Sequence, residues 1–457
     1  MKSYRAVLEW FFRRSNRQGN VRARAGPIFG VVALLLAASA EASAQAPPGW
    51  EPAKNPPPSD WIGPIFEPSF DFPNTMPASE ARPWEQIDFT AEPERYLNTV
   101  LDYVFEGQDP NSWRVQDNSV RHWYPVPWMV QHGNGREFVH GLTRERNSLA
   151  GELGPKHKRC TQAWAVGFYN PLGGYTLHQV FGDGTTPPNM AEARFPVGTV
   201  VAKVLLTEAN EQDTSIVRGA PEWDASINAP QPVDGRGCAL TTNPRTIARL
   251  RLLQFDVAVR DSRADKTTGW VFGTFIFDPN SSQANSWRKL RAVGLMWGND
   301  PDLSDQAASR AKPRESIVLY DAQLGRPFGR GGRMNGPVDN SISSCLSCHS
   351  TAMFEQKVSL TPRQEDDWDH AKCWFRNIKA GEAFGKQPSD SVPCGDTTGF
   401  TSLDYSLQLS RALINYSAAQ PFLPESMKLM PLNAPYRDLH ESIVRGEAPE
   451  IIFDVQR

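Results

Sequence analysis

The chain contains little cysteine and little histidine, 6 and 8 residues among 457. So few cysteines exclude a disulfide-dense scaffold, in which many bridges replace a hydrophobic core. An excess of positive charge is also lacking, since the formal net charge is −3. That balance argues against nucleic acid or an anionic membrane as the partner. The apolar run at residues 27–40 holds only 14 residues, which is too short for a comfortable membrane span of about 20.

The first 44 residues have the pattern of a secretory signal peptide. Seven basic side chains precede the apolar run, and residues 42–44 (Ala-Ser-Ala) form a small-residue cleavage site. We therefore expect export to the periplasm with cleavage after Ala44, and an uncleaved membrane anchor is the alternative. Cleavage would remove seven basic and two acidic residues, which takes the net charge from −3 to −8.

Residues 345–349 read Cys-Leu-Ser-Cys-His. Cys-x-x-Cys-His is the attachment motif of a c-type haem, in which two thiols form thioethers with the vinyl groups of one porphyrin. The histidine that follows supplies an imidazole nitrogen to the iron. Export agrees with this interpretation, because this haem is attached outside the cytoplasm. We therefore expect one haem c, joined to Cys345 and Cys348 and ligated by His349.

Three other interpretations of the motif remain open. A zinc site could combine Cys345, Cys348 and His349 with a fourth ligand such as Cys373. A redox dithiol would need a thioredoxin-like strand before Cys345, which the preceding Gly/Asn/Ser-rich stretch does not favour. The two cysteines could also be halves of structural disulfides.

Four cysteines lie outside the motif, at Cys160, Cys238, Cys373 and Cys394. In an oxidising compartment we expect them to pair. Sequence proximity favours Cys373–Cys394, which leaves Cys160–Cys238, and free thiols are the alternative. A disulfide across the shorter loop would stabilise the fold by roughly 3 kcal/mol through the unfolded state.

The 38 prolines and 34 glycines indicate a loop-rich chain that is mainly β rather than a helical bundle. Eleven of the prolines fall within residues 45–83, which predicts a Pro-rich N-terminal arm that we extend over residues 45–95. An N-terminal extension at 96–159 precedes a haem-binding β domain at 160–355. A helical and loop extension follows at 356–457. The predicted fold class is α+β, mainly antiparallel β.

Hydrophobic patterns predict the secondary structure of these regions. Strands are expected at 163–169, 175–181, 200–206, 249–260, 270–277 and within 287–297. The strands at 249–260 and 270–277 should form an antiparallel hairpin. Helical spacing predicts helices at 94–105 and within 400–419, and another is expected directly after the motif at 350–357.

Three charged residues stand out near these elements. Lys203 shares one face of its predicted strand with Val201 and Leu205, because strand side chains alternate. If that face is buried, the ammonium group needs a partner or a lowered pKa. Arg330 and Arg333 lie in a glycine-rich stretch before the motif, where they could bind a haem propionate. A solvated loop is the alternative for both arginines.

Three stretches of the chain resemble the cytochrome P-460 and cytochrome c′-beta proteins. They are residues 195–203 (FPVGTVVAK), residues 253–261 with 269–277 (LQFDVAVRD and GWVFGTFIF), and the haem motif that follows them. The resemblance covers roughly residues 160–354. It implies a small antiparallel β-fold around one c-type haem, with His349 as the proximal ligand and the opposite side open in a largely apolar pocket.

The resemblance also implies a role for Lys203. In the cytochrome P-460 branch the matching lysine is cross-linked to the porphyrin and the enzyme oxidises hydroxylamine. In the c′-beta branch there is no cross-link and the haem binds small gases. A cross-link requires the neutral amine, which an apolar pocket would favour. A lysine that extends to solvent or pairs with a carboxylate is the alternative. Ser344 stands where some active relatives carry an acidic residue, which counts against hydroxylamine oxidation.

These observations predict an exported mono-haem c-type cytochrome with an open sixth iron site. It would bind or act on small nitrogen species or diatomic gases and exchange electrons with an unidentified partner protein. Any enzymatic activity would be that of a haem oxidoreductase, of the hydroxylamine-oxidising type by resemblance. The alternative is an electron-transfer cytochrome in which Met427 or Met430 is the sixth ligand. In a third interpretation the haem is only a structural staple of a binding protein.

Overall fold

The computed structural model describes residues 59–419 apart from gaps, of which the longest are 64–68, 137–141, 233–237, 240–245, 321–327 and 386–399. The expected signal peptide, Met427 and Met430 therefore lie outside the described residues. No helix in the described part of the chain is long and apolar enough to cross a bilayer.

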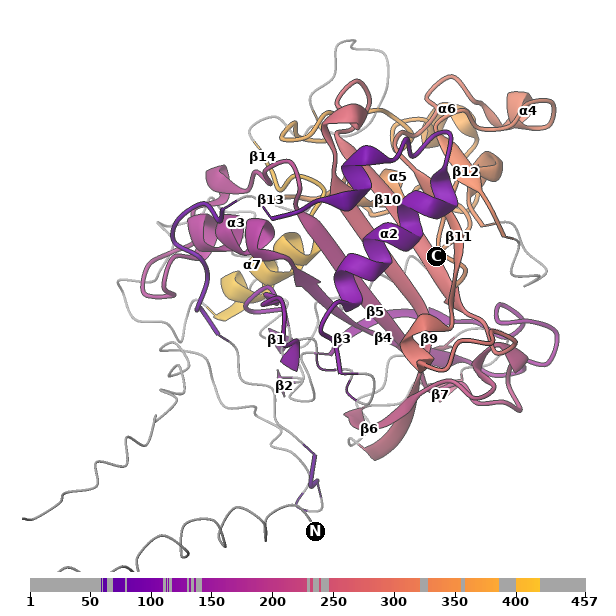
Figure 1. Ribbon diagram of the computed structural model, residues 1–457. Coiled ribbons are helices and arrows are strands. Elements are labelled where there is room, and N and C mark those ends of the chain that lie inside the picture. Colours follow the sequence, from indigo (N-terminus) through magenta and orange to yellow (C-terminus); the bar gives the residue numbers. More distant parts are fainter. Residues whose placement is uncertain are drawn as a thin grey trace, which may run out of the picture. The chain divides into compact units, whose positions relative to one another are not determined.

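An antiparallel sheet of eight strands forms the centre of the fold (Figure 1). Seven strands follow the order β12-β11-β10-β9-β5-β4-β3, and β6 pairs with the first part of β9. Strand β9 can pair with three others because it is 15 residues long. The strands are β3 (Thr143–Ser148), β4 (Thr161–Tyr169), β5 (Val200–Thr207), β6 (Glu222–Ile227), β9 (Thr246–Arg260), β10 (Trp270–Phe277), β11 (Leu290–Met296) and β12 (Ser316–Val318).

Helices and short strand pairs surround this sheet. The α-helices are α2 (Pro93–Phe105), α3 (Pro171–Phe181), α4 (Asp305–Ala308), α5 (Cys345–His349), α6 (Trp368–Ala371) and α7 (Leu407–Ala419). The 3₁₀ turns are η1 (Pro83–Gln86), η3 (Met190–Glu192), η4 (Ser215–Val217), η5 (Ser262–Ala264), η6 (Ser286–Arg288) and η7 (Arg330–Gly332). Three pairs of two-residue strands are β1 (Gln131–His132) with β2 (Gly135–Arg136), β7 (Gln231–Pro232) with β8 (Cys238–Ala239), and β13 (Met353–Phe354) with β14 (Thr401–Ser402).

Both faces of the sheet are covered, so its central strands are apolar on both sides. On one face Val200 packs in a cluster, called here the first core, with Leu97 of α2, the helix that crosses in front of the sheet in Figure 1. On the other face Phe272 packs in the second core with Leu346 of α5 and Leu409 of α7. Each fully buried side chain of this size contributes about 1.5–3 kcal/mol. The helix that carries the Cys-x-x-Cys-His motif is therefore part of the second core.

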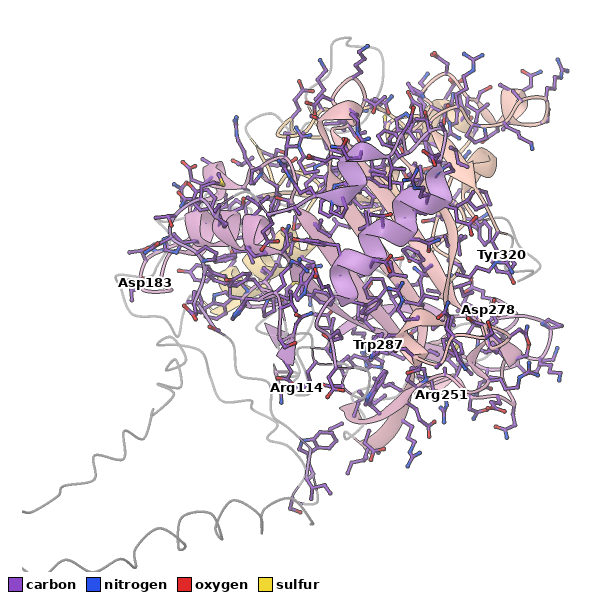
Figure 2. The ribbon with its side chains drawn as sticks, viewed as in Figure 1. Arg114, Asp183, Arg251, Asp278, Trp287 and Tyr320 are labelled. Atoms are coloured by element: carbon purple, nitrogen blue, oxygen red, sulfur yellow. The ribbon has the colours of Figure 1, made fainter. Side chains whose placement is uncertain are left out.

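Aromatic contacts close the end of the first core. Trp287, labelled in Figure 2, is 1% exposed. Its ring centroid is 5.3 Å from that of Phe105 and 5.4 Å from that of Trp223. These rings come from the end of α2, from η6 and from β6, so they join the long β9–β6 ribbon to the main sheet.

Most of the predicted elements are confirmed. Strands β4, β5, β9, β10 and β11 lie where apolar or alternating runs predicted strands, and β9 pairs with β10 as an antiparallel hairpin. Helix α2 matches the helix predicted at 94–105 but begins one residue earlier, and α7 lies within the stretch predicted at 400–419. The fold is accordingly a mainly antiparallel β structure with a few helices.

The strand predicted at 175–181 is wrong, because these residues belong to helix α3. Asn170 caps this helix, since its side-chain oxygen accepts a hydrogen bond from the Gly173 amide at 3.2 Å. Pro171 occupies the first helical position, where its missing N–H costs nothing. Gly182 ends the helix with a φ of 56°. The end signals of a helix therefore outweigh the strand-like composition of its second half.

The helix predicted at 350–357 is also wrong. Helix α5 ends at His349, and the short strand β13 follows it and pairs with β14. Residues 355–357 lie outside the described part of the chain.

Regions expected to lie outside the β domain pack into it. Trp84, Ile87 and Phe89, which fall inside the predicted arm at 45–95, are at least 95% buried in the first core. Strand β3 from the predicted N-terminal extension is one edge strand of the main sheet, and helix α7 from the C-terminal extension joins the second core. The described residues after Ser43 thus belong to one compact unit.

Candidate functional site

Local hydrogen bonds give the Cys-x-x-Cys-His motif its helical shape. The Ser344 hydroxyl accepts a hydrogen bond from the Ser347 amide at 3.1 Å, and the Ser347 hydroxyl accepts one from the Ser344 amide at 2.7 Å. This reciprocal pair is a capping box, which starts helix α5 at Cys345. Residues three and four positions apart share a helix face, so Cys345, Cys348 and His349 point the same way. All three line one cavity, whereas Ser347 is buried on the other side.

His349 is held in one orientation. Its Nδ1 donates a hydrogen bond to the Tyr405 carbonyl oxygen at 2.9 Å, since a carbonyl can only accept. The Phe272 ring packs against the imidazole with centroids 4.7 Å apart. Burial lowers the pKa of His349 to about 4, although the Tyr405 hydrogen bond opposes the shift. The imidazole is therefore neutral at neutral pH, with Nε2 left as the nitrogen that can bind a metal.

Cys345 and Cys348 are free thiols. Burial raises the pKa of Cys345 well above its usual range and that of Cys348 to about 12. Both side chains are therefore neutral at neutral pH. A redox dithiol requires a lowered thiolate pKa, so this environment does not favour one.

The cavity lies between helix α5 and the second face of the sheet. Strands β5, β9 and β10 line one side, and residues from β3, from the loop before α5 and from the C-terminal segment complete the wall. About 1070 Å³ within it is not filled by protein atoms, counting the part open to solvent. About 140 Å³ is accessible to the centre of a water molecule, which is room for on the order of ten waters. The figure of about 140 Å³ is smaller than the roughly 300–1,000 Å³ typical of cofactor pockets, and part of the remaining unfilled space opens to solvent.

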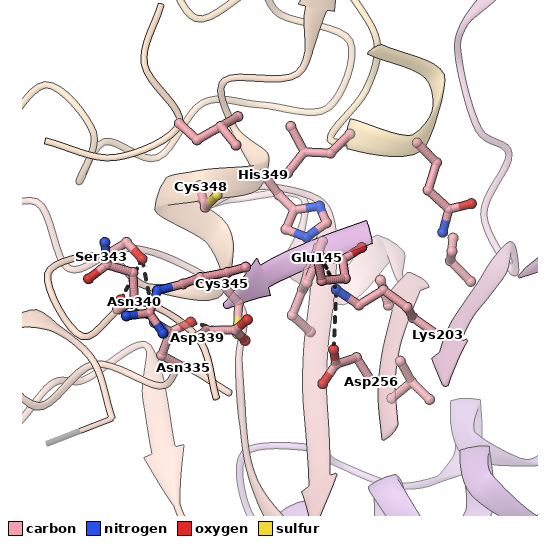
Figure 3. A pocket seen from close by; sticks show the side chains of 18 of the residues that line it. Glu145, Lys203, Asp256, Asn335, Asp339, Asn340, Ser343, Cys345, Cys348 and His349 are labelled. Carbon is pink, nitrogen blue, oxygen red and sulfur yellow. Dashed lines mark hydrogen bonds and ion pairs between the residues drawn. The ribbon is translucent and has the colours of Figure 1, made fainter. Parts of the chain in front are cut away.

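Lys203 lies in this cavity between two carboxylates (Figure 3). Its Nζ is 3.6 Å from Glu145 and 3.7 Å from Asp256, and its side chain is 22% exposed. Asp256 stands directly opposite Lys203 in the β5–β9 pair, which brings the two side chains together. Burial alone would lower the pKa of Lys203, but the two carboxylates outweigh it and raise the pKa above its ordinary value. Lys203 thus has the carboxylate partners that its buried strand face required, and its role toward a haem stays a prediction.

Asp256 belongs to a hydrogen-bond network on the cavity wall. It accepts hydrogen bonds from Gln254 Nε2 at 2.8 Å and from the Thr274 hydroxyl, and Gln254 Nε2 also lies 3.4 Å from an Asp339 oxygen. Burial raises the pKa of Asp256 to about 6, although Lys203 opposes the shift. Burial raises the pKa of Glu145 as well. The wall therefore carries two carboxyl groups with raised pKa values, of which Asp256 gains or loses its proton near pH 6.

Two polar atoms of cavity-lining residues have no hydrogen-bond partner. They are the Thr361 hydroxyl and the Gln408 amide oxygen, both buried. The Gln408 side chain lies against Gly167, where an added Cβ would come within 2.0 Å of the amide nitrogen. Buried polar groups in native proteins normally find a partner. Their lack of one here fits a cavity whose walls are completed by a bound group.

The structure does not bring Arg330 and Arg333 to this cavity. Arg333 is fully buried, and its guanidinium donates to the carbonyl oxygens of Asn299, Asp300 and Leu303 at 2.7–2.8 Å. Arg330 forms an ion pair with Asp305 at 2.7 Å. Neither side chain lines the cavity, so neither is placed to bind a haem propionate there. Arg333 is not in a solvated loop either, because it is fully buried.

Sequence reasoning missed several cavity residues. Glu145 and Met129 come from the region before the resemblance, and Thr361 and Gln408 come from the region after it. No motif marks them, because they reach the cavity only through the packing of distant segments. Helical spacing at 400–419 indicated an apolar face but not that Gln408 would lie over Gly167.

The remaining cysteines are placed in part. Cys160 and Cys373 are disulfide-bonded, while the side chains of Cys238 and Cys394 lie outside the described part of the structure. The expected pairing therefore stays a prediction. Because Cys373 is in a disulfide, it cannot be the fourth ligand of a zinc site. Among the described residues, no three His, Cys, Asp or Glu side chains group as a metal ion would require.

Comparisons with protein-family models, with curated proteins and with solved structures found no match for this chain. The resemblance to the cytochrome P-460 and c′-beta proteins thus rests on the quoted residues alone.

Proposed function

We propose that this protein is an exported c-type cytochrome with one haem, joined to Cys345 and Cys348 and ligated by His349. The observation that carries the proposal is that these three side chains line one cavity, with His349 tied to a carbonyl through Nδ1. A metal-binding histidine typically donates its other ring nitrogen in this way. The signal peptide pattern agrees, since haem of this type is attached after export.

The other interpretations of the motif have less support. Free thiols with raised pKa values suit neither a structural disulfide nor a redox dithiol. Cys373 is not available as the fourth ligand of a zinc site because it is in a disulfide, and the described residues contain no group of three metal-ligating side chains. A thioether needs no thiolate in the finished protein, so buried, neutral sulfur atoms are compatible with haem attachment.

A haem held here would supply an iron centre for binding small ligands and for one-electron chemistry. The chain would contribute His349 as the proximal ligand, Phe272 as the apolar contact that fixes its ring, and a charged wall at Lys203. On that wall the carboxyl groups of Glu145 and Asp256 can accept protons. They could take the place of the acidic residue that some active relatives carry at the position of Ser344. We infer that the ligand is a small nitrogen species or a diatomic gas, and that proton-coupled oxidation by a haem oxidoreductase is chemically feasible.

The resemblance to cytochrome P-460 and c′-beta proteins is part of this proposal. An antiparallel sheet with a cavity-lining lysine before the motif supports it. The carboxylates beside Lys203 depart from the largely apolar pocket of those families. A protonated amine is not a nucleophile, so we favour Lys203 as a distal-pocket cation over a cross-linked residue.

An electron-transfer cytochrome remains the second candidate. Met129 lines the cavity with His349, so a thioether other than those of Met427 and Met430 is available as the sixth ligand. Methionine ligation would close the iron and raise its potential.

Production of the mature protein alongside a haem-attachment apparatus tests the proposal. One covalently bound haem per chain is expected, with loss of colour when Cys345 and Cys348 are both replaced by serine and retention of colour in the matched Ser347→Ala variant. Colourless wild-type protein, or zinc bound at the motif, would overturn the proposal. After reduction, a rapid spectral change with carbon monoxide indicates an open sixth site, whereas no change favours methionine ligation.

A further inference from the structure

Two consecutive residues in the segment that contacts His349 have a left-handed backbone. Asp404 has a φ of 47° and Tyr405 has a φ of 66°. This region is unfavourable for residues with a side chain, and a bulky aromatic residue there is an outlier. Such a conformation persists only where surrounding contacts over-determine it, and outliers of this kind concentrate at functional sites.

The Asp404 carboxylate holds this turn from three directions. It accepts hydrogen bonds from the Phe195 amide at 2.8 Å, the Trp270 indole at 3.1 Å and the Gly381 amide at 3.2 Å. The side chain is 3% exposed, so none of these bonds competes freely with water. The donors lie before β5, on β10 and before β14, which ties the turn to three separate parts of the fold.

The side chains that follow add two more attachments. The Tyr405 hydroxyl donates to the Ile378 carbonyl oxygen, and the ring is buried. The Ser406 hydroxyl lies 2.6 Å from the Tyr169 hydroxyl on β4. The side chains of all three residues at this turn are therefore hydrogen-bonded to other segments of the fold.

The Tyr405 carbonyl oxygen of this turn accepts the hydrogen bond from Nδ1 of His349, which lines the cavity. The direction of this carbonyl follows from the backbone dihedrals of the turn. Relaxation to an ordinary negative φ would rotate the peptide groups and weaken the bond to His349. Phe272 would still touch the imidazole, but it offers no acceptor for Nδ1.

We propose that Asp404 is a positioning residue for the haem ligand, because it anchors the left-handed turn that keeps the Tyr405 carbonyl on His349 Nδ1. This inference rests on the proposed haem-binding function. A hydrogen bond from the outer ring nitrogen raises the basicity of a ligating imidazole. A more basic ligand stabilises ferric over ferrous iron, so the anchored turn lowers the reduction potential.

Asp404→Asn in the haem-loaded protein tests the proposal, because asparagine keeps the shape but loses the charge and one pair of acceptor sites. The readouts are the reduction potential from a spectroelectrochemical titration and the iron–histidine stretching frequency of the ferrous form. We expect the ferrous-to-ferric ratio at a fixed applied potential to rise roughly three- to tenfold, which corresponds to the net free energy of one ordinary hydrogen bond. We expect the iron–histidine stretching frequency to fall. Tyr405→Phe, which loses only the hydroxyl contact with Ile378, should give a smaller change of the same sign.

Asp261→Asn is the matched control. Asp261 is also 3% exposed and bonded by its carboxylate, to Tyr96 and Arg263, but it lies outside the cavity lining. We expect it to reduce stability without changing either readout. A wild-type potential in folded, haem-loaded Tyr405→Phe and Asp404→Asn would overturn the inference, as would an equal shift in Asp261→Asn. Absence of haem from the wild-type protein is a separate result that overturns the proposed function itself.

Discussion

Replacement of Lys203 by methionine tests the charged wall of the cavity. The substitution keeps an unbranched side chain of similar length but removes the only positive charge placed between Glu145 and Asp256 among the described ion pairs. Both carboxyl groups already have raised pKa values because they are buried, and Lys203 opposes that rise in each case. Without the ammonium group, both pKa values rise further.

The expected cost depends on pH. Removing one partner of a buried ion pair typically costs about 3–5 kcal/mol. The Lys203 side chain is 22% exposed and its contacts are 3.6 and 3.7 Å long, so we expect the lower figure or less, about 2–3 kcal/mol at pH 8. A carboxyl group whose pKa is raised by folding binds its proton more tightly in the folded state, so it destabilises the fold as pH rises through the folded pKa. At pH 5 the Asp256 carboxyl group of the variant is largely protonated, and the loss should shrink to about 1 kcal/mol.

The free energy of unfolding of the wild-type protein should also fall as pH rises. Asp256, whose pKa is raised from 3.8 to about 6, accounts for a loss of about 2 kcal/mol in the free energy of unfolding between pH 4 and pH 7, and of about 1 kcal/mol between pH 5 and pH 8. Urea titrations followed by tryptophan fluorescence at pH 5 and pH 8 measure both effects. Lys266→Met, on an exposed turn, is the control and should change stability by no more than about 0.5 kcal/mol. An equal loss at the two pH values, or none at pH 8, would refute the ion-pair reasoning.

Three further predictions concern the same region. Peptide mass spectrometry should find the haem on the peptide that contains Cys345 and Cys348 but not joined to the Lys203 peptide, and a joined species would show that the amine had lost its proton. Ser344→Ala removes the cap of α5 and should lower the free energy of unfolding by about 1–2 kcal/mol in a denaturant titration, and a neutral result would mean that packing alone holds the helix. Gln408→Met removes a buried amide oxygen without a partner, so stability without added ligand should stay level or rise by up to about 1 kcal/mol; a clear loss in thermal melts would indicate a bond that the structure does not record.

Local patterns predicted most strands of the sheet but misassigned several segments that pack around it. The alternation in β9 and the continuous apolar run in β10 were sufficient to predict both strands, and β10 is apolar throughout because both of its faces are buried. The stretch at 175–181 was misassigned because its aromatic and β-branched residues suit a strand, whereas Asn170, Pro171 and Gly182 set the ends of a helix. Trp84 and Phe89 were assigned to an arm because proline density upstream of them masked their role in the core.

The sequence by itself determined the spacing that makes haem attachment the best interpretation, since two thiols and an imidazole at i, i+3 and i+4 meet on one helix face wherever that helix lies. It also determined that Lys203 would face the same side of its strand as Val201. Only the tertiary structure decided which groups face that lysine, because Glu145 and Asp256 are brought to it by strand order and register. Only the tertiary structure placed the Tyr405 carbonyl on His349. Contacts between segments so far apart in the chain depend on how whole elements pack, which no local pattern encodes.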